Sequence, residues 1–322
     1  MGPRPERPVP PEMSAMVSDS GAPAAESLAG VGAEHEAFQP QVVSVVIPAY
    51  NAEQVLPTQL QALGRQTYRE RWEVIVADNG SSDQTRQVAE SYREQLPSLI
   101  VVDASRVRGP SHARNIGAQS ASGDLLLFCD ADDLVHEEWV AAMVAASTDA
   151  DLLAGPITPT RDPEAHDSGL LPADRARPHF GFLPWNTAGN LAVRRAVFDH
   201  VGGFDEHRRL GEDVEFCWRV QLTGYRFRFV PEAHVTYRLD SLRRVAARQY
   251  AFGREAPGLY EEFSWAGAPR LTASPLLIAT LRAVLRAPWA LRSRQTRLLW
   301  ITSTAGLVGR WSGLLRLRRS RQ

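Results

Sequence analysis

The segment VSVVIP, residues 43–48, begins the folded part of the chain. A short run of β-branched residues that ends in a proline is typical of a buried strand. Residues 54–66 follow with apolar side chains at helical spacing, and residues 72–77 form a second apolar run that ends in Asp78-Asn79-Gly80. Together these segments predict one β-α-β unit.

The same alternation of apolar patterns continues along the chain. We expect helices at 83–95 and 111–120, and strands at 99–102 and 125–129. Strands that alternate with helices predict an α/β fold with a Rossmann-like, mostly parallel sheet that is flanked by helices. Ligands of such sheets bind beyond the carboxyl ends of the strands, and this sequence places acidic residues there.

The pattern is less regular after residue 150. Residues 155–190 are rich in Pro, Gly and Asp and predict a loop. We expect a short helix at 194–200, an amphipathic helix at 212–222 and a last strand at 225–230.

Composition narrows the class of protein. The 322 residues, 44% of them hydrophobic, suit one large or two modest globular domains. A net charge of -1 gives no support for nucleic-acid binding. Two cysteines in apolar segments predict a reducing, cytoplasmic compartment without a disulfide framework. Residues 1–40 have few large apolar side chains and no signal-peptide pattern, which predicts a disordered leader before an α/β domain at 41–240.

Polar residues follow the first two predicted strands. Pro48-Ala49-Tyr50-Asn51 stands where a dinucleotide-binding protein would have a glycine-rich turn, although a simple turn also explains it. Asp78 ends the second strand, where a carboxylate can accept hydrogen bonds from a base or a ribose hydroxyl. Asp83 fits a helix cap better.

An acidic cluster follows the strand at 125–129. Asp130, Asp132 and Asp133 repel one another unless a cation neutralises them. Carboxylate oxygens of this kind suit Mg²⁺ or Mn²⁺, which take further ligands from water and substrate phosphates. A solvated acidic loop is the alternative.

A second acidic pair, Glu212-Asp213, follows Gly211 at the start of the helix at 212–222. The helix dipole stabilises one acid at that position. The pair, together with a separate metal-binding cluster, indicates a general base.

In this order and spacing, the motifs resemble the family 2 glycosyltransferases of the GT-A fold. The resemblance spans Val42 to Arg238. It rests on the motifs above and on three further segments, Ala113-Arg114-Asn115, Gly189-Asn190 and Gly202-Gly203-Phe204-Asp205-Glu206. It implies an enzyme that moves a sugar, with inversion, from a nucleotide diphosphate donor to an acceptor hydroxyl. Family frequency favours UDP.

The resemblance also implies roles for individual residues. Asp213 would be the catalytic base, and Glu212 would orient the acceptor. The donor would contact Pro48, Tyr50, Asn51, Asp78, Arg114 and Asp130. Mn²⁺ or Mg²⁺ would be held by Asp130, Asp132 and His234, although a histidine at a strand end is also commonly structural. Gly189, Asn190 and Trp185 would lie on the acceptor side, with a core position as the alternative for Trp185.

Residues 263–322 contain no Asp or Glu and many arginines. Apolar stretches at 275–285 and 298–315 lie between these charges. This pattern predicts a helical C-terminal extension, 241–322, that binds an anionic membrane surface on the inner face of the cell membrane. A lipid-linked or cell-envelope glycan acceptor would be presented there. Packing on the catalytic domain and dimerisation are the alternatives.

Three other functions compete with sugar transfer. A phosphatase of the haloacid dehalogenase type also has D-x-D after a strand, but on its first strand, and Leu134 replaces the Thr or Val expected there. A nucleotidyltransferase does not explain Glu212-Asp213. A non-catalytic sugar-nucleotide-binding or membrane scaffold protein would not need acids at both sites. The Q-x-x-R-W motif of processive relatives is absent from the sequence, so we expect addition of a single sugar.

Overall fold

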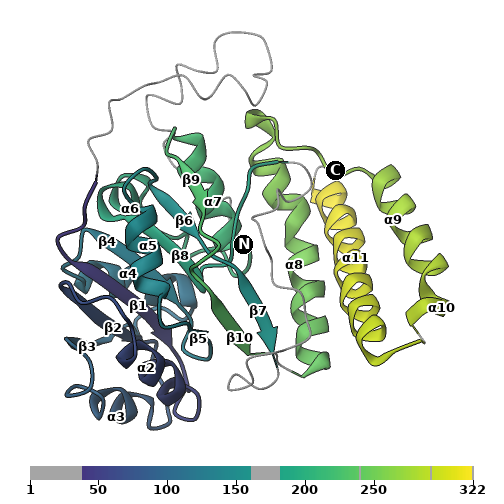
Figure 1. Ribbon diagram of the computed structural model, residues 1–322. Coiled ribbons are helices and arrows are strands. Elements are labelled where there is room, and N and C mark those ends of the chain that lie inside the picture. The colour runs from purple at the N-terminus through teal and green to yellow at the C-terminus, as the bar shows by residue number, and fades with distance from the viewer. Residues whose placement is uncertain (1–37, 161–181, 239–240, 291, 321–322) are drawn as a thin grey trace.

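The computed structural model describes residues 38–160, 182–238, 241–290 and 292–320 (Figure 1). The predicted leader therefore lies almost wholly outside the described residues. Of its last residues, Phe38 lies under the Arg194 guanidinium, with the guanidinium carbon 4.4 Å from the ring centre. The middle of the predicted 155–190 loop also lies outside the description.

A seven-stranded sheet forms the centre of the α/β domain. Its strand order is β3-β2-β1-β4-β8-β6-β9. The strands are β1 (Val43–Ala49), β2 (Trp72–Asp78), β3 (Leu99–Asp103), β4 (Leu125–Cys129), β6 (Leu152–Ala154), β8 (Asn190–Arg194) and β9 (Phe227–Phe229). Only β8 runs antiparallel to its neighbours, β4 and β6. The predicted mostly parallel α/β sheet is confirmed.

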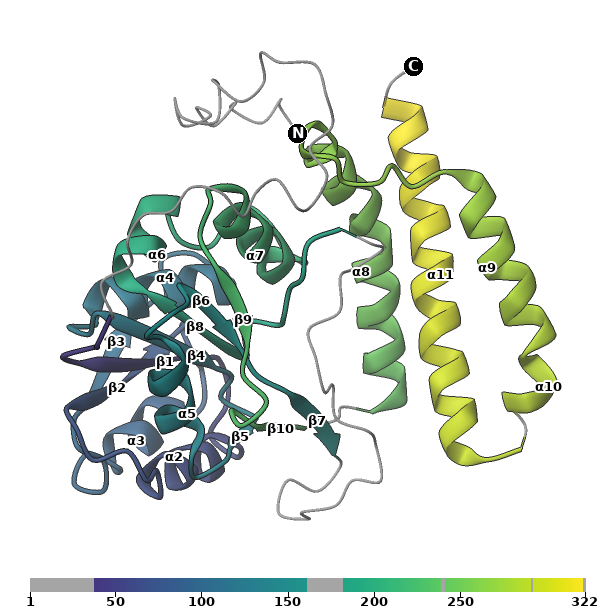
Figure 2. The same ribbon diagram turned by 45° about the horizontal axis from the view of Figure 1, so that its top comes forward.

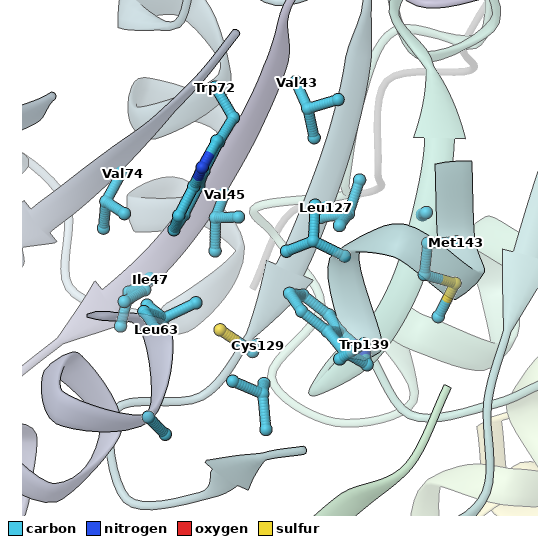
Figure 3. Close-up of a cluster of buried hydrophobic side chains, with 14 of the residues drawn as sticks. Val43, Val45, Ile47, Leu63, Trp72, Val74, Leu127, Cys129, Trp139 and Met143 are labelled. Atoms are coloured by element: carbon cyan, nitrogen blue, oxygen red, sulfur yellow. The ribbon is translucent and has the colours of Figure 1, made fainter. Parts of the chain in front are cut away.

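Helices cover both faces of this sheet because successive strand residues point to opposite sides. Val45 and Ile47 of β1 pack on the first face, with Trp139 (Figure 3). Val46 packs on the second face, with Phe216. The first face is covered by α2 (Leu56–Gly64), α3 (Thr85–Glu90) and α5 (Trp139–Ala146), and the second by α4 (Pro110–Ser120), α6 (Arg195–Val201) and α7 (Glu212–Leu222).

A small sheet stands beside the acidic cluster. It has the order β5-β10-β7, formed by β5 (Leu134–Val135), β10 (Val235–Arg238) and β7 (Ile157–Thr160). The central strand β10 pairs antiparallel with β5 and parallel with β7. Strand β7 lies within the predicted 155–190 loop, so that part of the prediction is wrong. Strands of two to four residues carry no readable periodicity, and they form here only through pairing with distant segments.

The C-terminal extension is helical, as predicted. It consists of α8 (Leu242–Glu262), a 3₁₀ turn η3 (Ser264–Ala266), α9 (Ala273–Leu285), α10 (Ala287–Ala290) and α11 (Arg294–Ser320). Helix α11 lies between α8 and α9 in both views (Figures 1 and 2). Helix α8 packs on α7, where the Trp218 ring contacts the rings of Tyr260 and Phe263 at 5.3 and 5.5 Å. No helix in the described ranges is both long and apolar enough to cross a membrane.

Close backbone packing holds α11 against α8. A Cβ atom added to Gly309 would meet the carbonyl oxygen of Tyr250, and one added to Gly313 would meet that of Arg254. On α8, a Cβ on Gly253 would meet the carbonyl oxygen of Gly306. These glycines let the two helices approach more closely than larger residues would allow.

Candidate active site

The turns after β1 and β2 are tied to each other at the carboxyl edge of the sheet. Asn51 has a φ of 49°, and its side-chain oxygen accepts a hydrogen bond from the Ser82 amide at 2.8 Å. Its own amide donates to the Ser81 hydroxyl at 3.0 Å. Asp78 accepts from the Ser81 amide at 3.0 Å. The sequence-predicted donor residues Asn51 and Asp78 are thus brought together, and Pro48 lies beside Ala77 in the same strand pair.

Tyr50 presents its ring beside this pair of turns. It is 54% exposed, and the Arg108 guanidinium carbon lies 4.6 Å from the ring centre. Arg108 also donates to the Asn79 carbonyl at 3.3 Å. Arg86 of α3 is 3.9 Å from the other oxygen of Asp78. An exposed aromatic ring next to a carboxylate and two cations offers stacking and hydrogen bonds to a nucleoside. Sequence reasoning missed both arginines, because nothing local marks them.

Arg114 joins the two acidic motifs. Its guanidinium is buried and bonds Asp130 at 2.7 Å and Glu212 at 3.4 Å. Burial alone would lower the pKa of Arg114, but Asp130 and then Glu212 raise it overall. The buried cation therefore stays charged, and it holds the end of β4 next to the start of α7.

The three aspartates after β4 have different surroundings. Asp130 is half-buried, Asp132 is exposed and Asp133 is buried. Burial raises the pKa of Asp133 well above its usual range, and Asp130 and Asp132 raise it further. A Cβ on Gly189 would come within 2.9 Å of the second oxygen of Asp130 and 3.1 Å of an oxygen of Asp133. Only glycine lets the chain before β8 pass so close to these carboxylates.

The cluster offers two accessible carboxylates to a cation. Arg114 bonds one Asp130 oxygen, the other Asp130 oxygen faces Gly189, and Asp132 is an exposed residue. Within the described ranges, no three His, Cys, Asp or Glu side chains are grouped as a metal site, so His234 is not assembled with the aspartates. Its ring lies 5.4 Å from that of His136. The donor set fits a hard cation that takes its other ligands from water and phosphates.

Asp213 lies in the first turn of α7. Gly211 precedes the helix with a φ of 77°, a left-handed conformation that turns the chain into the site. Asp213 is half-buried and accepts from the Val214 amide at 2.8 Å. Burial and then the charge of Glu212 raise the pKa of Asp213, the Val214 amide and Arg114 lower it, and the resulting pKa is about 7. A carboxylate with a pKa near neutrality is suited to general base catalysis.

The side chain of Asn190 is used inside the protein. It is fully buried, and its oxygen accepts from the Trp139 indole at 2.8 Å. Its nitrogen donates to the carbonyls of Pro156 and Ala233 at 3.0 and 2.8 Å. Both ends of the amide bind protein groups, so the side chain has a structural role, and an acceptor-side position of the 189–190 backbone stays a prediction.

Trp185 is half-buried and stacks on Phe252 of α8, with ring centres 6.0 Å apart. This contact favours the core reading of Trp185 that the sequence left open. It also belongs to the packing of α8 against the catalytic domain.

Helix α8 supplies a cation that sequence reasoning missed. Arg248 donates a hydrogen bond to the Tyr237 hydroxyl, and its guanidinium carbon lies 5.2 Å from the centre of that ring. Its positive charge partly offsets the raised pKa of Asp133, which places it near the acidic cluster. Helix α8 lies in the extension that was predicted to be helical, but no local pattern at Arg248 indicates that it lies near the acidic cluster.

Comparisons with known proteins agree with this geometry. The description "Glycosyl transferase family 2" matches residues 44–204, and "Glycosyl transferase family group 2" matches residues 125–312. Glycosyltransferase AglE of Haloferax volcanii is 29% identical over 223 residues, which cover 66% of this chain and 72% of that protein.

Two solved structures share the fold. The Staphylococcus aureus TarS crystal structure has a TM-score of 0.52 and 20% identity, covering 79% of this chain and 44% of that one. The mannosyltransferase PcManGT from Pyrobaculum calidifontis, in complex with GDP-Man and Mn²⁺, has a TM-score of 0.58 and 18% identity, covering 90% and 92%. The chain thus spans less than half of TarS. At such low identity these structures show the GT-A fold alone, and the matches to the family establish the rest: the chain belongs to glycosyl transferase family 2 and is a glycosyltransferase.

Proposed function

We propose that this glycosyltransferase moves a single sugar from a UDP-sugar to an acceptor hydroxyl, with inversion at the sugar carbon. One observation carries the proposal. Asp213 has a pKa of about 7 and adjoins Glu212, which Arg114 connects to Asp130. A carboxylate with a pKa near neutrality is therefore connected, through Glu212 and Arg114, to the acidic cluster on the proposed donor side.

The reaction needs a single displacement. Asp213 takes the proton from the acceptor hydroxyl as that oxygen attacks the anomeric carbon from the face opposite the diphosphate. The bond between the anomeric carbon and the diphosphate oxygen breaks, and its electron pair leaves with the nucleotide. One attack from the opposite face inverts the configuration. Glu212, held by Arg114, orients the acceptor.

We assign the diphosphate to the space before Asp130 and Asp132. A divalent cation, Mn²⁺ or Mg²⁺, supplies charge neutralisation to the leaving diphosphate when it is bound. Asp132 and the second oxygen of Asp130 would hold it, while Arg114 bonds the first oxygen of Asp130. His234, which is not grouped with these aspartates in the described ranges, is left out of this ligand set.

The nucleoside would lie over the carboxyl ends of β1 and β2. The Tyr50 ring would stack on the base, and Asp78 would accept from the base or the ribose. UDP is our choice because TarS, a structural neighbour, was solved with UDP and with UDP-GlcNAc. PcManGT was solved with GDP-Man, so the base requires a direct test.

The acceptor would be a lipid-linked or cell-envelope glycan, reached on the inner, cytoplasmic face of the cell membrane. TarS, named a poly(ribitol-phosphate) β-N-acetylglucosaminyltransferase, is a relative with an envelope polymer as acceptor. The Gly189 backbone passes close to Asp130, which supports a place for this segment beside the transferred sugar.

The Asp213→Asn variant tests the base. We expect transfer to fall by about 10²–10⁴-fold while the nucleotide still binds, because the proton-accepting group is lost. Asp199→Asn, an exposed acid of α6, is the matched control and should keep full activity. Transfer by Asp213→Asn at the unmodified rate would refute the assignment.

A thermal-shift panel tests the donor. We expect a UDP-sugar with Mn²⁺ to raise the melting temperature more than GDP-, dTDP- or CDP-sugars, because a ligand that binds the native state stabilises it. Asp132→Ala should remove the metal-dependent part of that shift. Equal shifts with and without Mn²⁺ would contradict the metal role.

A further inference from the structure

Helix α9 carries an apolar face that no described residue covers. Its members lie on one side of the helix, at spacings of one, three and four residues, and each is more than half exposed: Leu277, Ile278, Leu281, Val284 and Leu285. We call these five residues the α9 apolar face. Trp289 of α10 follows it and is also more than half exposed. Exposed apolar patches of this continuity mark interaction surfaces.

The opposite side of α9 is already used for packing. Leu276 is buried with Leu307 and Leu314 of α11. Thr280 accepts from the Trp311 indole at 3.0 Å, and the Ala283 carbonyl accepts from the Trp300 indole at 2.8 Å. The α9 apolar face is therefore held in a fixed orientation, facing away from α11, on the outermost helix of the molecule (Figures 1 and 2).

The charges around this face are all positive. Arg282 and Arg286 are exposed and follow the apolar positions on one flank of α9. Arg292 is exposed as well, with its guanidinium carbon 4.5 Å from the Trp289 ring centre. The whole sequence from 263 to 322 contains no acidic residue. An apolar helix face that is flanked by arginine and ends in tryptophan matches the chemistry of an interfacial helix on anionic lipid.

We propose that the α9 apolar face, with Trp289, inserts into the headgroup region of an anionic lipid bilayer, and that Arg282, Arg286 and Arg292 contact lipid phosphates. The helix lies in the plane of the surface and does not cross it, which agrees with the lack of a spanning helix in the described ranges. This inference is independent of the proposed reaction, since it needs neither donor nor acceptor.

Charge argues against a second copy of the chain as the occupant. A twofold contact places the same surface on both sides. It would bring the arginines beside α9 towards their own copies, with no acid between 263 and 322 to pair with them. Anionic lipid supplies the missing negative charge.

The experiment is co-flotation of the full chain with vesicles. One set contains phosphatidylcholine with about one third phosphatidylglycerol, and the other contains phosphatidylcholine alone. We expect flotation with the anionic set only, weakened by added salt. Absence of flotation with anionic vesicles at low salt would overturn the proposal.

Substitutions assign the binding to this face. The triple variant Ile278→Asn, Leu281→Asn, Leu285→Asn should raise the lipid concentration for half-binding by about tenfold or more. The double variant Val308→Asn, Leu315→Asn changes exposed apolar residues of α11 and should change it by less than about twofold. Equal losses in the two variants would overturn the assignment to α9.

Three further readouts separate the alternatives. Donor hydrolysis and circular dichroism of the triple variant should match the unsubstituted protein, because all three side chains are exposed. Light scattering should give a monomer for both proteins. If the unsubstituted protein were a dimer that the triple variant disrupts, and if it did not bind vesicles, the proposal would be overturned. The partner of the α9 apolar face would then be a second copy of the chain.

Discussion

The α/β domain and the C-terminal helices use their side chains in opposite ways. In the α/β domain, large apolar residues fill both faces of the sheet, and the buried edge collects charges such as Arg114, Asp130 and Asp213. Between α8 and α11, glycines form the tightest contacts, and large apolar residues remain on the outside of α9. Burial in the first region shifts the pKa of its acids, whereas in the second region large apolar side chains of α9 stay exposed.

The largest expected effect comes from removing the central charge of the first region. Arg114→Ala should destabilise the protein by about 3–5 kcal/mol in urea unfolding and abolish transfer, because Asp130 and Glu212 lose their buried partner. Arg209→Ala, an exposed arginine before α7, is the control. A stability loss no greater than that of Arg209→Ala would mean that the acids do not depend on this cation, and the contrast between the regions would fail.

In the second region, a single methyl group should be enough to disturb packing. Gly309→Ala should cost about 1–3 kcal/mol, because the added carbon meets the Tyr250 carbonyl. Gly258→Ala in α8 is matched in chemistry but has no neighbouring atom near the new carbon, so it should stabilise by up to about 1 kcal/mol. Thermal unfolding measures both. Stabilisation by both substitutions would show that the glycines are not needed for close approach.

The pH dependence sharpens the account of Asp213. Because its folded pKa of about 7 exceeds the ordinary 3.8, the folded protein keeps a proton that the unfolded chain releases, so stability falls as pH rises from 4 to 7. Asp213→Asn should remove this slope and gain about 1–3 kcal/mol at pH 8. In the unsubstituted enzyme, kcat/KM should rise with pH up to about 7. A flat profile from pH 5 to 8 would exclude Asp213 as the base.

The smallest effect is expected from the exposed ring of Tyr50. Tyr50→Ala should weaken UDP binding by about five- to tenfold in calorimetry, because base stacking is lost, and leave the unfolding midpoint unchanged. Tyr50→Phe keeps the ring and should bind as the unsubstituted protein does. If Tyr50→Ala bound UDP with full affinity, the nucleoside would not stack on this ring.

Local patterns were sufficient for the strands and helices up to residue 130 and for the identity of the acidic motifs. Helix α8 lies in the extension predicted to be helical, but its bounds could not be predicted, because Gly253, Pro257 and Gly258 weaken its helical pattern and packing against α7 and α11 overrides that weakness. The predicted ends of helices were also unreliable, since the helix predicted at 83–95 ends at Glu90.

The roles of single polar residues depended on distant contacts. Asn190 carries a motif that favours an acceptor contact, yet three groups from separate segments occupy its amide. The raised pKa of Asp213 arises from burial that the complete fold produces, so no spacing could have predicted it. Trp185 could not be assigned before Phe252 was known to lie beside it.

One guanidinium group links the two acidic motifs, since Arg114 bonds Asp130 and Glu212 and acts on Asp213. If the donor binds beside Asp130 as proposed, its binding and proton uptake by Asp213 are thermodynamically coupled. Coupling between two binding events is reciprocal. If the donor changes the proton affinity of Asp213 by some factor, protonation of Asp213 changes the affinity for that donor by the same factor. Measuring donor affinity as a function of pH therefore reports the protonation state of Asp213 without any turnover.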